Sequence, residues 1–274
     1  FLSHKNEGEK FILFVHPKDS ISEVWHGFRW GLDGAKEVFK ADRSHSIKDF
    51  ESLLQNYLKG ADELVFSVGK NKRIESILLD IWSKQLEELS RTGRAPNAIR
   101  SPDVFLNEMR LIKSEYEIVR MREAAQISAE AHEFVRANAS GKKNERQLQG
   151  LIEGFFLDKG TRGPAYNSIV ASGDNACVLH YTSNSSELKK GDLILIDAGC
   201  SLIDYYNGDI TRTIPIGGKF SKEQKLIYEI VLEAQKTAIK NSVKGSNSSN
   251  VHNVALRILV EGLKEIELLR GDTD

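Results

Sequence analysis

The sequence predicts an α/β domain followed by an α+β domain. Short apolar segments at 11–15 and 63–69 have the composition of buried strands, and stretches with helical periodicity follow each of them. Strands that alternate with helices in this way are typical of an α/β domain. Further along the chain come two helices, then a group of strands, then two more helices. Elements grouped in blocks of one kind indicate an α+β domain.

The elements of the first part follow from local patterns. The apolar run 11–15 ends just before Pro17, and proline is expected to terminate a buried strand. Helices are predicted at 46–58 and at 73–89, where apolar residues recur on one face.

A polar segment that contains glycine and proline, 91–97, indicates a loop near a domain boundary. We therefore predict an amino-terminal domain over residues 1–105 and a second domain over residues 106–274.

The helices of the second part begin with capping patterns, in which Ser or Asn is followed three residues later by Glu or Gln. A strand is expected at 167–171, and a loop with Cys177 and His180 leads from it to two further strands. A loop rich in glycine, serine and asparagine precedes the last helix, which is expected to end at Gly271. The three capping pairs of the first three helices are Ser114 with Glu117, Asn144 with Gln147, and Ser221 with Gln224.

The composition of the chain is that of an ordinary globular protein. It has 274 residues, of which 40% are hydrophobic and 28% charged. A net charge of -1 and the lack of a long apolar run argue against a nucleic-acid or membrane partner. Two cysteines provide no disulfide framework, so we expect a reducing compartment, the cytoplasm. The chain opens on Phe1 without a signal-peptide pattern, so we expect either processing or a piece of a longer protein.

Two aspartates in the strand group are the main candidates for a functional site. Asp197 ends the apolar run 193–196, which has the pattern of a strand covered on both faces. Asp209 follows an Asn-Gly turn and is expected to begin the return strand, on the same face as Thr211 and Thr213. Residues opposite each other on antiparallel strands have Cβ atoms about 4.5–5.5 Å apart. Two carboxylates that close repel unless a proton or a cation lies between them, so the pair predicts a metal site.

Two other interpretations of these residues remain open. Each aspartate could be solvated, one at a strand end and the other in a turn. Alternatively, Cys177, His180, Asp197 and Cys200 could form a four-ligand zinc site, although their spacing lacks the tight cysteine pairs of structural zinc sites. A pair of octahedral ions needs more protein ligands than two carboxylates supply, so the chain is expected to hold only part of the ligand set.

The segments around the aspartates resemble the metal-dependent Xaa-Pro aminopeptidases (aminopeptidase P), which have the pita-bread fold. The motifs are IDAGC with Asp197 and GDITRT with Asp209, preceded by YNSIVASG and LHYT. Segment 108–132 resembles the helical entry to the catalytic domain of that family, and segment 23–29 its amino-terminal tryptophan motif. The likeness covers most of the chain. It implies an α/β amino-terminal domain plus the first half of an α+β pita-bread catalytic domain.

The resemblance also implies roles for individual residues. Asp197 and Asp209 match the ligands of two divalent metal ions, usually Mn(II). His180 matches a catalytic residue that contacts substrate beside the scissile bond, and Tyr166 matches a tyrosine close to the metal centre. Trp25 matches a tryptophan of the substrate pocket, often that of a neighbouring subunit, which implies a dimer or tetramer.

Two departures from the family pattern stand out. Eleven residues separate the aspartates, one more than the family usually has, and we expect the hairpin loop to absorb the extra residue. The remaining His and two Glu ligands of the family would lie beyond Asp274. The segment 270–274 resembles the loop before the missing histidine motif. We therefore expect a chain that is incomplete at both ends and inactive by itself.

The expected function is that of a dinuclear-metal aminopeptidase, which releases the N-terminal residue from peptides that have proline in second position. An Xaa-Pro dipeptidase (prolidase) shares the strand-pair motif and is the first alternative. A non-catalytic pita-bread module that binds peptides or proteins is the second, because a fold does not fix a function.

Overall fold

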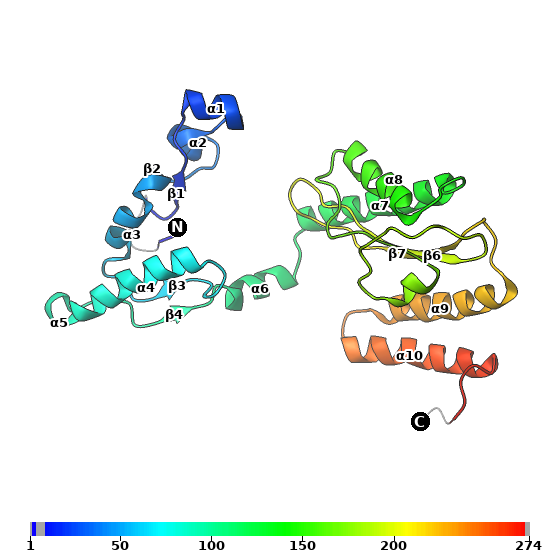
Figure 1. Cartoon of the computed structure of the whole chain (residues 1–274). Helices are drawn as coiled ribbons and strands as arrows, with labels where there is room; N and C mark the ends of the chain where they lie inside the picture. The colour runs from blue at the N-terminus through cyan, green and yellow to red at the C-terminus, as the bar shows by residue number, and fades with distance from the viewer. Residues whose placement is uncertain (1, 4–8, 272–274) are drawn as a thin grey trace. The chain divides into compact units, whose positions relative to one another are not determined.

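The computed structural model describes residues 2–3 and 9–271, and it divides the chain into two compact units (Figure 1). The first unit runs from Phe1 to Ile112 and the second from Lys113 to Asp274. The division falls a few residues after the boundary predicted at 105/106, because helix α6 (Asp103–Leu111) belongs to the first unit. Part of the carboxyl-terminal loop predicted at 270–274 lies outside the described residues.

The first unit contains two small parallel strand pairs surrounded by helices. Strand β1 pairs in parallel with β2, and β3 pairs in parallel with β4. Its elements are β1 (Ile12–Val15), α1 (Ser20–His26), α2 (Gly31–Glu37), β2 (Arg43–Ser46), the 3₁₀ helix η1 (Ile47–Asp49), α3 (Phe50–Leu58), β3 (Leu64–Val65), α4 (Lys72–Glu87), α5 (Leu89–Thr92), β4 (Ile99–Arg100) and α6. The mixture of strands and helices agrees with the predicted α/β class. The predicted strand 63–69 proves shorter, and α1, α2, β2, β4 and α6 were not expected from the sequence.

One hydrophobic cluster holds helices α3 and α4 on the β3–β4 pair. Its buried members come from α3, β3 and α4, and partly buried apolar side chains surround them. The buried members are Leu54, Leu58, Leu64, Leu78 and Ile81. The apolar face predicted for the helix at 73–89 therefore faces this core, as its periodicity requires.

The second unit contains a three-stranded antiparallel sheet in the order β5-β6-β7. Helices α7 and α8 pack against it, and their buried side chains share one core with those of the strands. The elements are α7 (Glu115–Asn138), α8 (Glu145–Asp158), β5 (Ile169–Ser172), the 3₁₀ helix η2 (Gly173–Cys177), β6 (Leu193–Asp197), β7 (Thr211–Pro215), α9 (Lys222–Asn241) and α10 (Ser248–Glu265). This block order confirms the predicted α+β class.

The helix starts of the second unit lie where the capping patterns predicted them. Ser114 and Ser221 each form a complete capping box. The Asn144 side chain accepts a hydrogen bond from the backbone N–H of Gln147 and thereby caps α8. This is one of the two hydrogen bonds that make up a capping box. Helix α10 ends at Glu265, before the predicted end at Gly271.

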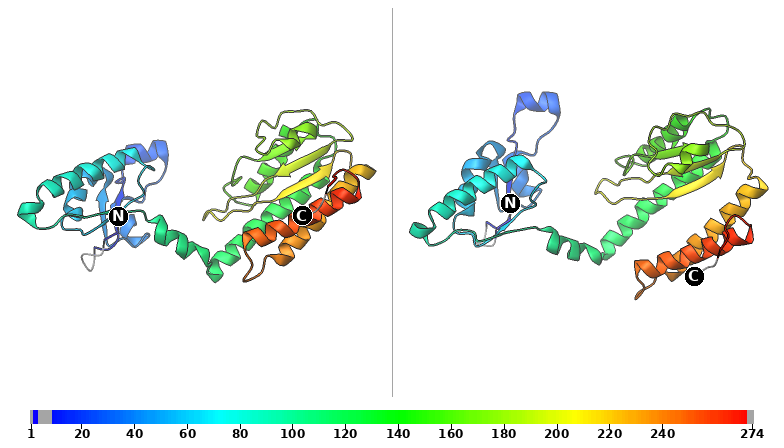
Figure 2. Two further views of the ribbon diagram at one scale, coloured as in Figure 1. Left: turned by 90° about the horizontal axis from the view of Figure 1, so that it is seen from below. Right: turned by 60° about the horizontal axis from the view of Figure 1, so that its bottom comes forward.

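Helices α9 and α10 form a closely packed pair and run side by side in both views of Figure 2. In Figure 1, α8 and α9 lie on opposite sides of strands β6 and β7. On β6, Ile194 and Ile196 are buried while Leu193 and Leu195 are only half-buried. The strand is thus fully covered on one face and partly covered on the other, whereas its continuous apolar run predicted burial on both. Among the described residues, no helix is long and apolar enough to cross a membrane.

Candidate metal centre

Asp197 and Asp209 both lie against the hydroxyl of Tyr166. The Tyr166 hydroxyl is 2.6 Å from Asp197 Oδ1 and 3.0 Å from Asp209 Oδ1. The distance between the two carboxylate oxygens therefore cannot exceed the sum of these two distances. A metal ion, or a bridged pair of ions, can span that separation.

The position of Tyr166 follows from backbone pairing of the segment before it. The N–H of Ala165 donates to the Gly199 carbonyl at 2.8 Å, and that of Ser201 donates to Gly163 at 2.9 Å. Strand β5 then continues beside β6, where Ile169 pairs with Asp197. The tyrosine is held between these two sets of hydrogen bonds, next to the end of β6.

The two aspartates are diagonal neighbours, which corrects the expectation that they lie directly opposite. Asp197 pairs with Thr211, two residues beyond Asp209. Asp209 itself precedes β7, because the regular ladder ends at Asp197 and Thr211. Diagonal residues have Cα atoms about 7–8 Å apart, which leaves room for the Tyr166 hydroxyl between the carboxylates.

The turn of the hairpin also differs from the prediction. The chain reverses over Leu202–Tyr206, where the Tyr205 N–H donates to Leu202 and the Leu202 N–H donates to Tyr206. Tyr205 has a φ of 69°. Asn207 pairs with Ser201 and so belongs to the return arm. The Asn-Gly pair therefore does not form the turn, because the chain reverses in the residues before it.

The cluster of Tyr166 and the two aspartates is short of positive charge. A phenol carries a single proton, so Tyr166 can donate to only one of the two carboxylates at a time. Burial, then hydrogen bonding to Asp197, raises the pKa of Tyr166, so the phenol stays protonated. Neither carboxylate forms an ion pair with a described basic residue. A divalent cation fits this set of hard oxygen donors.

Within the described parts of the chain, no group of three or more His, Cys, Asp or Glu side chains gathers around a common point. The four-residue zinc interpretation is therefore wrong. Cys200 is fully buried with its sulfur against the Ala124 carbonyl of α7, whereas Cys177 is exposed. Burial raises the pKa of the Cys200 thiol, so this side chain is a core residue in the protonated form.

Two glycines allow the hairpin to lie close to α7. A Cβ atom on Gly208 would be 2.1 Å from Ser128 Oγ and 2.8 Å from the Ala124 carbonyl oxygen. A Cβ atom on Gly199 would be 1.9 Å from the Gly208 carbonyl oxygen. Ser128 Oγ accepts from the backbone N–H of Cys200 at 3.0 Å, which ties the hairpin to the helix. Gly208 is thus required for close packing and not for a turn.

His132 lies one helical turn beyond Ser128 and contacts the same hairpin. Its Nε2 is 3.0 Å from the carbonyl oxygen of Ala198, the residue after Asp197. The side chain is buried, and this burial lowers its pKa despite the opposing effect of the carbonyl contact. A neutral imidazole that donates through Nε2 fits this position.

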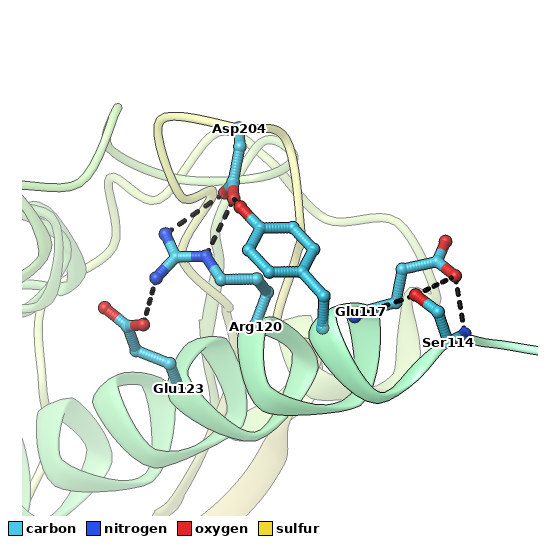
Figure 3. Close-up of polar contacts among 6 residues, drawn as sticks. Ser114, Glu117, Arg120, Glu123 and Asp204 are labelled. Atoms are coloured by element: carbon cyan, nitrogen blue, oxygen red, sulfur yellow. Dashed lines mark hydrogen bonds and ion pairs between the residues drawn. The ribbon is translucent and has the colours of Figure 1, made fainter.

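An ion pair anchors the tip of the hairpin to the start of α7. Figure 3 shows the guanidinium of Arg120 between the carboxylates of Asp204 and Glu123. Arg120 binds Asp204 in a bidentate manner, with Nε–Oδ2 and Nη2–Oδ1 distances of 2.7 and 3.2 Å. The Tyr116 hydroxyl donates to Asp204 as well, at 2.9 Å. These contacts fix the loop that joins the two aspartate-bearing segments.

His180 is not brought into contact with the aspartates. It lies in the turn that follows η2, with an exposed side chain that forms no hydrogen bond to another described residue. The neighbouring Tyr181 is held by Glu145, a buried residue of α8, at 2.8 Å. The loop backbone therefore decides where the imidazole lies.

Trp25 belongs to helix α1 in the first unit, and 78% of its surface is exposed. Three other apolar side chains on or next to this helix are exposed to a similar degree. They are Ile21, Val24 and Phe28. Trp25 therefore lies on the surface of the first unit and not in its core.

Several residues that shape the site were not identified from the sequence. Ser128, His132 and Arg120 look like ordinary positions of a long helix, although Ala124, Ser128 and His132 do recur at four-residue intervals. That spacing, with small residues at its start, is the signal that a backbone segment packs closely on the helix.

Comparison with known proteins identifies the family. The sequence profile of metallopeptidase family M24 matches residues 119–269, more than half of the chain. The chain belongs to metallopeptidase family M24. A second profile, that of the aminopeptidase P N-terminal domain, matches residues 1–66. The suspected relationship to the aminopeptidase P family is thereby confirmed, as is the order of an α/β domain and a pita-bread domain.

Individual relatives of this M24 chain are similar over nearly its whole length. The Xaa-Pro aminopeptidase of Haemophilus influenzae is 39% identical over 97% of the chain. The structure of aminopeptidase PepP from Pseudomonas aeruginosa is 39% identical with a TM-score of 0.92, over 99% of this chain and 61% of that one. A zinc-substituted aminopeptidase P of Escherichia coli in complex with product is 38% identical with a TM-score of 0.90, over 95% and 59%. The chain spans 59% of the length of the Haemophilus enzyme.

Proposed function

We propose that the full-length protein is a dinuclear-metal aminopeptidase that releases the N-terminal residue from peptides with proline in second position. The observation that carries this proposal is the convergence of Asp197 and Asp209 on the Tyr166 hydroxyl, which lies within hydrogen-bond distance of both carboxylates. The names of its M24 relatives supply the substrate class.

Asp197 and Asp209 would hold two divalent ions, which we propose to be Mn(II). Such ions, when bound, supply a water whose pKa is lowered towards neutrality and which can attack a peptide carbonyl. Tyr166 stays protonated, and its hydroxyl donates a hydrogen bond to one of the two carboxylates. The contacts of Arg120, Tyr116 and Ser128 with the hairpin would hold the segments that carry the two carboxylates in place.

We assign His180 to the substrate side of this centre. Its imidazole is exposed and free of other hydrogen bonds among the described residues, so it is available to a peptide. A donor at this position would stabilise the charge that develops as the peptide bond breaks. We assign Trp25 to the substrate pocket of a neighbouring subunit in a dimer or tetramer, for which its exposed apolar surroundings are suited.

The remaining properties follow from composition and from the two free cysteines. We propose a cytoplasmic protein that acts on peptides and has neither a nucleic acid nor a membrane as partner. Cys177 and Cys200 do not pair with each other, as a reducing compartment requires.

The test is a peptidase assay on the full-length protein. A tripeptide with proline in second position is expected to lose its first residue when Mn(II) is present, and the same peptide with alanine in that position is not. Asp209→Asn is expected to lower kcat/KM at least about a hundredfold. The matched control is Asp158→Asn at the exposed end of α8, which is expected to leave the rate unchanged.

Three results would contradict the proposal or redirect it. Cleavage of Xaa-Pro dipeptides but not of longer peptides would identify a dipeptidase. Binding of proline peptides without cleavage, in the presence of Mn(II), would indicate a non-catalytic module. An Asp209→Asn variant as active as the unmodified protein would exclude the metal centre described here.

A further inference from the structure

Glu145 is a buried carboxylate without a cationic partner. Its side chain is fully buried at the first turn of α8, and no ion pair to a described basic residue involves it. A buried charge is costly unless other groups compensate for it. Here five hydrogen bonds from neutral donors do so.

All five donors belong to the segment that carries His180. Glu145 Oε1 accepts from Ser172 N and Ser172 Oγ, both at 2.8 Å, and from Asn175 Nδ2 at 3.0 Å. Oε2 accepts from the Tyr181 hydroxyl and from Ser186 N, both at 2.8 Å. A single carboxylate thus binds the start, the middle and the end of this segment.

The charge of Glu145 is retained because of these bonds. Burial by itself raises the pKa of the carboxyl group, but the donors from Asn175, Ser172 and Ser186 outweigh it and hold the pKa below its ordinary value. A charged acceptor binds neutral donors about twice as strongly as a neutral one does.

The ends of the segment are fixed to the rest of the unit by other contacts as well. Asn184, which is also buried, accepts from Val170 N at 2.9 Å and donates to the Ser168 carbonyl at 2.8 Å. The Glu145 N–H donates to the Ser186 carbonyl at 3.0 Å. These contacts hold the region after His180, whereas Tyr181 depends on Glu145 for its hydroxyl hydrogen bond.

The consequence concerns the one residue of this segment with a proposed role in the reaction. The His180 side chain is exposed and forms no hydrogen bond or ion pair with another residue that the structure describes, and Tyr181 is the next residue along the chain. The position of the His180 backbone is therefore coupled to that of Tyr181, whose hydroxyl Glu145 holds. Strand β5 pairs antiparallel with β6, so that Ile169 lies opposite Asp197, whereas Ser172, where the segment begins, lies opposite Ile194 near the other end of β6.

We propose that Glu145 is a positioning residue, which holds the loop 173–186, and through Tyr181 the side chain of His180, in the conformation that the reaction needs. This inference rests on the proposed function for the part that concerns His180. The five hydrogen bonds of the carboxylate all go to residues 172–186, so it would act through this segment.

The test uses Tyr181→Phe and Glu145→Gln in the full-length protein. The first change deletes one hydrogen bond to Glu145 and leaves the other four. The second keeps the shape of the side chain but replaces one of the two acceptor oxygens with an NH₂ group. That group would then face N–H or O–H donors and could not accept from them. The matched control is Tyr228→Phe on α9, whose hydroxyl forms no hydrogen bond to another described residue.

Kinetics separate a positioning role from a purely structural one. Tyr181→Phe and Glu145→Gln are each expected to lower kcat about tenfold while KM changes less than about threefold. In a His180→Ala background the same changes are expected to lower kcat less than about twofold, because the residue through which they act is already absent. An equal loss in both backgrounds would overturn the proposal. If Glu145→Gln does not fold, the kcat losses caused by Tyr181→Phe in the two backgrounds test the proposal by themselves.

A second measurement does not depend on peptidase activity. Amide hydrogen exchange within 173–186 is expected to speed up at least about tenfold in both variants and to stay unchanged in Tyr228→Phe. If exchange responds but no peptide is cleaved by the unmodified protein, the proposed function fails while the loop anchor stands. Unchanged exchange in both variants would overturn the anchor itself.

Discussion

Replacing Gly208 with alanine is expected to destabilise the second unit of the protein. The new Cβ atom would lie 2.1 Å from Ser128 Oγ, well inside the 3.4 Å at which ordinary van der Waals contact begins, and 2.8 Å from the Ala124 carbonyl oxygen. The serine hydroxyl can rotate away, but the carbonyl belongs to the backbone of α7 and cannot. Either the hairpin or the helix must therefore move.

The magnitude follows from two effects. Forcing an extra methyl group into a packed core costs about 1–3 kcal/mol. If Ser128 Oγ rotates away, the buried N–H of Cys200 loses its acceptor, which costs about 1–3 kcal/mol more. The lower flexibility of alanine in the unfolded chain returns up to about 1 kcal/mol. We expect a net loss of about 2–4 kcal/mol, a large part of the stability of a typical domain.

Urea unfolding of the full-length protein measures this change. Gly154→Ala is the matched control, since a Cβ atom there meets nothing within 4 Å in the interior of α8. We expect that control to stabilise the protein by up to about 1 kcal/mol. Ser128→Gly combined with Gly208→Ala removes the side-chain collisions, but it also deletes the acceptor of the Cys200 N–H and leaves the Ala124 carbonyl, so full recovery of the stability is not expected.

One result would refute the reasoning about this contact. If Gly208→Ala unfolds within about 0.5 kcal/mol of the unmodified protein, the hairpin does not lie as close to α7 as described. Asp209 is the next residue, so the same variant is also expected to bind divalent metal more weakly, which calorimetry can measure.

Three further predictions concern the anchors of the second unit. Asp204→Ala removes the carboxylate through which Arg120 holds the hairpin tip, so amide exchange at the tip is expected to speed up at least about tenfold. Unchanged exchange would contradict the anchoring role. Because burial lowers the pKa of His132 below 6.5, the unfolded state binds the proton more readily, so stability is expected to fall as pH drops below about 6.5. The urea midpoint of His132→Gln should depend less on pH in that window, and an equally steep dependence would assign the effect to other groups. Ser221→Ala removes the cap of α9 and is expected to cost about 1 kcal/mol in thermal unfolding, and no change would mean that the cap is dispensable.

The secondary structure of the second unit was predictable to a large extent. Capping residues and apolar periodicity act within a few residues of one another, so Ser114, Asn144 and Ser221 each marked a helix start correctly. The first unit was less predictable. Helix α1 has a mostly exposed apolar side, and strand β2, with the sequence Arg43–Ser46, lacks the apolar alternation of a half-buried strand.

The candidate site was predictable only in its composition. The sequence indicated Asp197 and Asp209 as a pair and Tyr166 as their neighbour. Their diagonal arrangement depends on the register of β6 and β7, in which Asp197 pairs with Thr211, and the sequence does not specify that register. Glu145 was not recognisable at all, because an acidic residue in the first turn of a helix is ordinarily solvated.

The sequence by itself determined the family, the kinds of element and the two acidic side chains, since these are encoded in short motifs. The tertiary structure alone decided which atoms meet. Tyr166 and Asp197 are 31 residues apart, Glu145 and Ser186 are 41 apart, and Ser128 and Cys200 are 72 apart. Contacts across such separations form only when the whole core is packed, because each depends on the backbone positions that all the others impose.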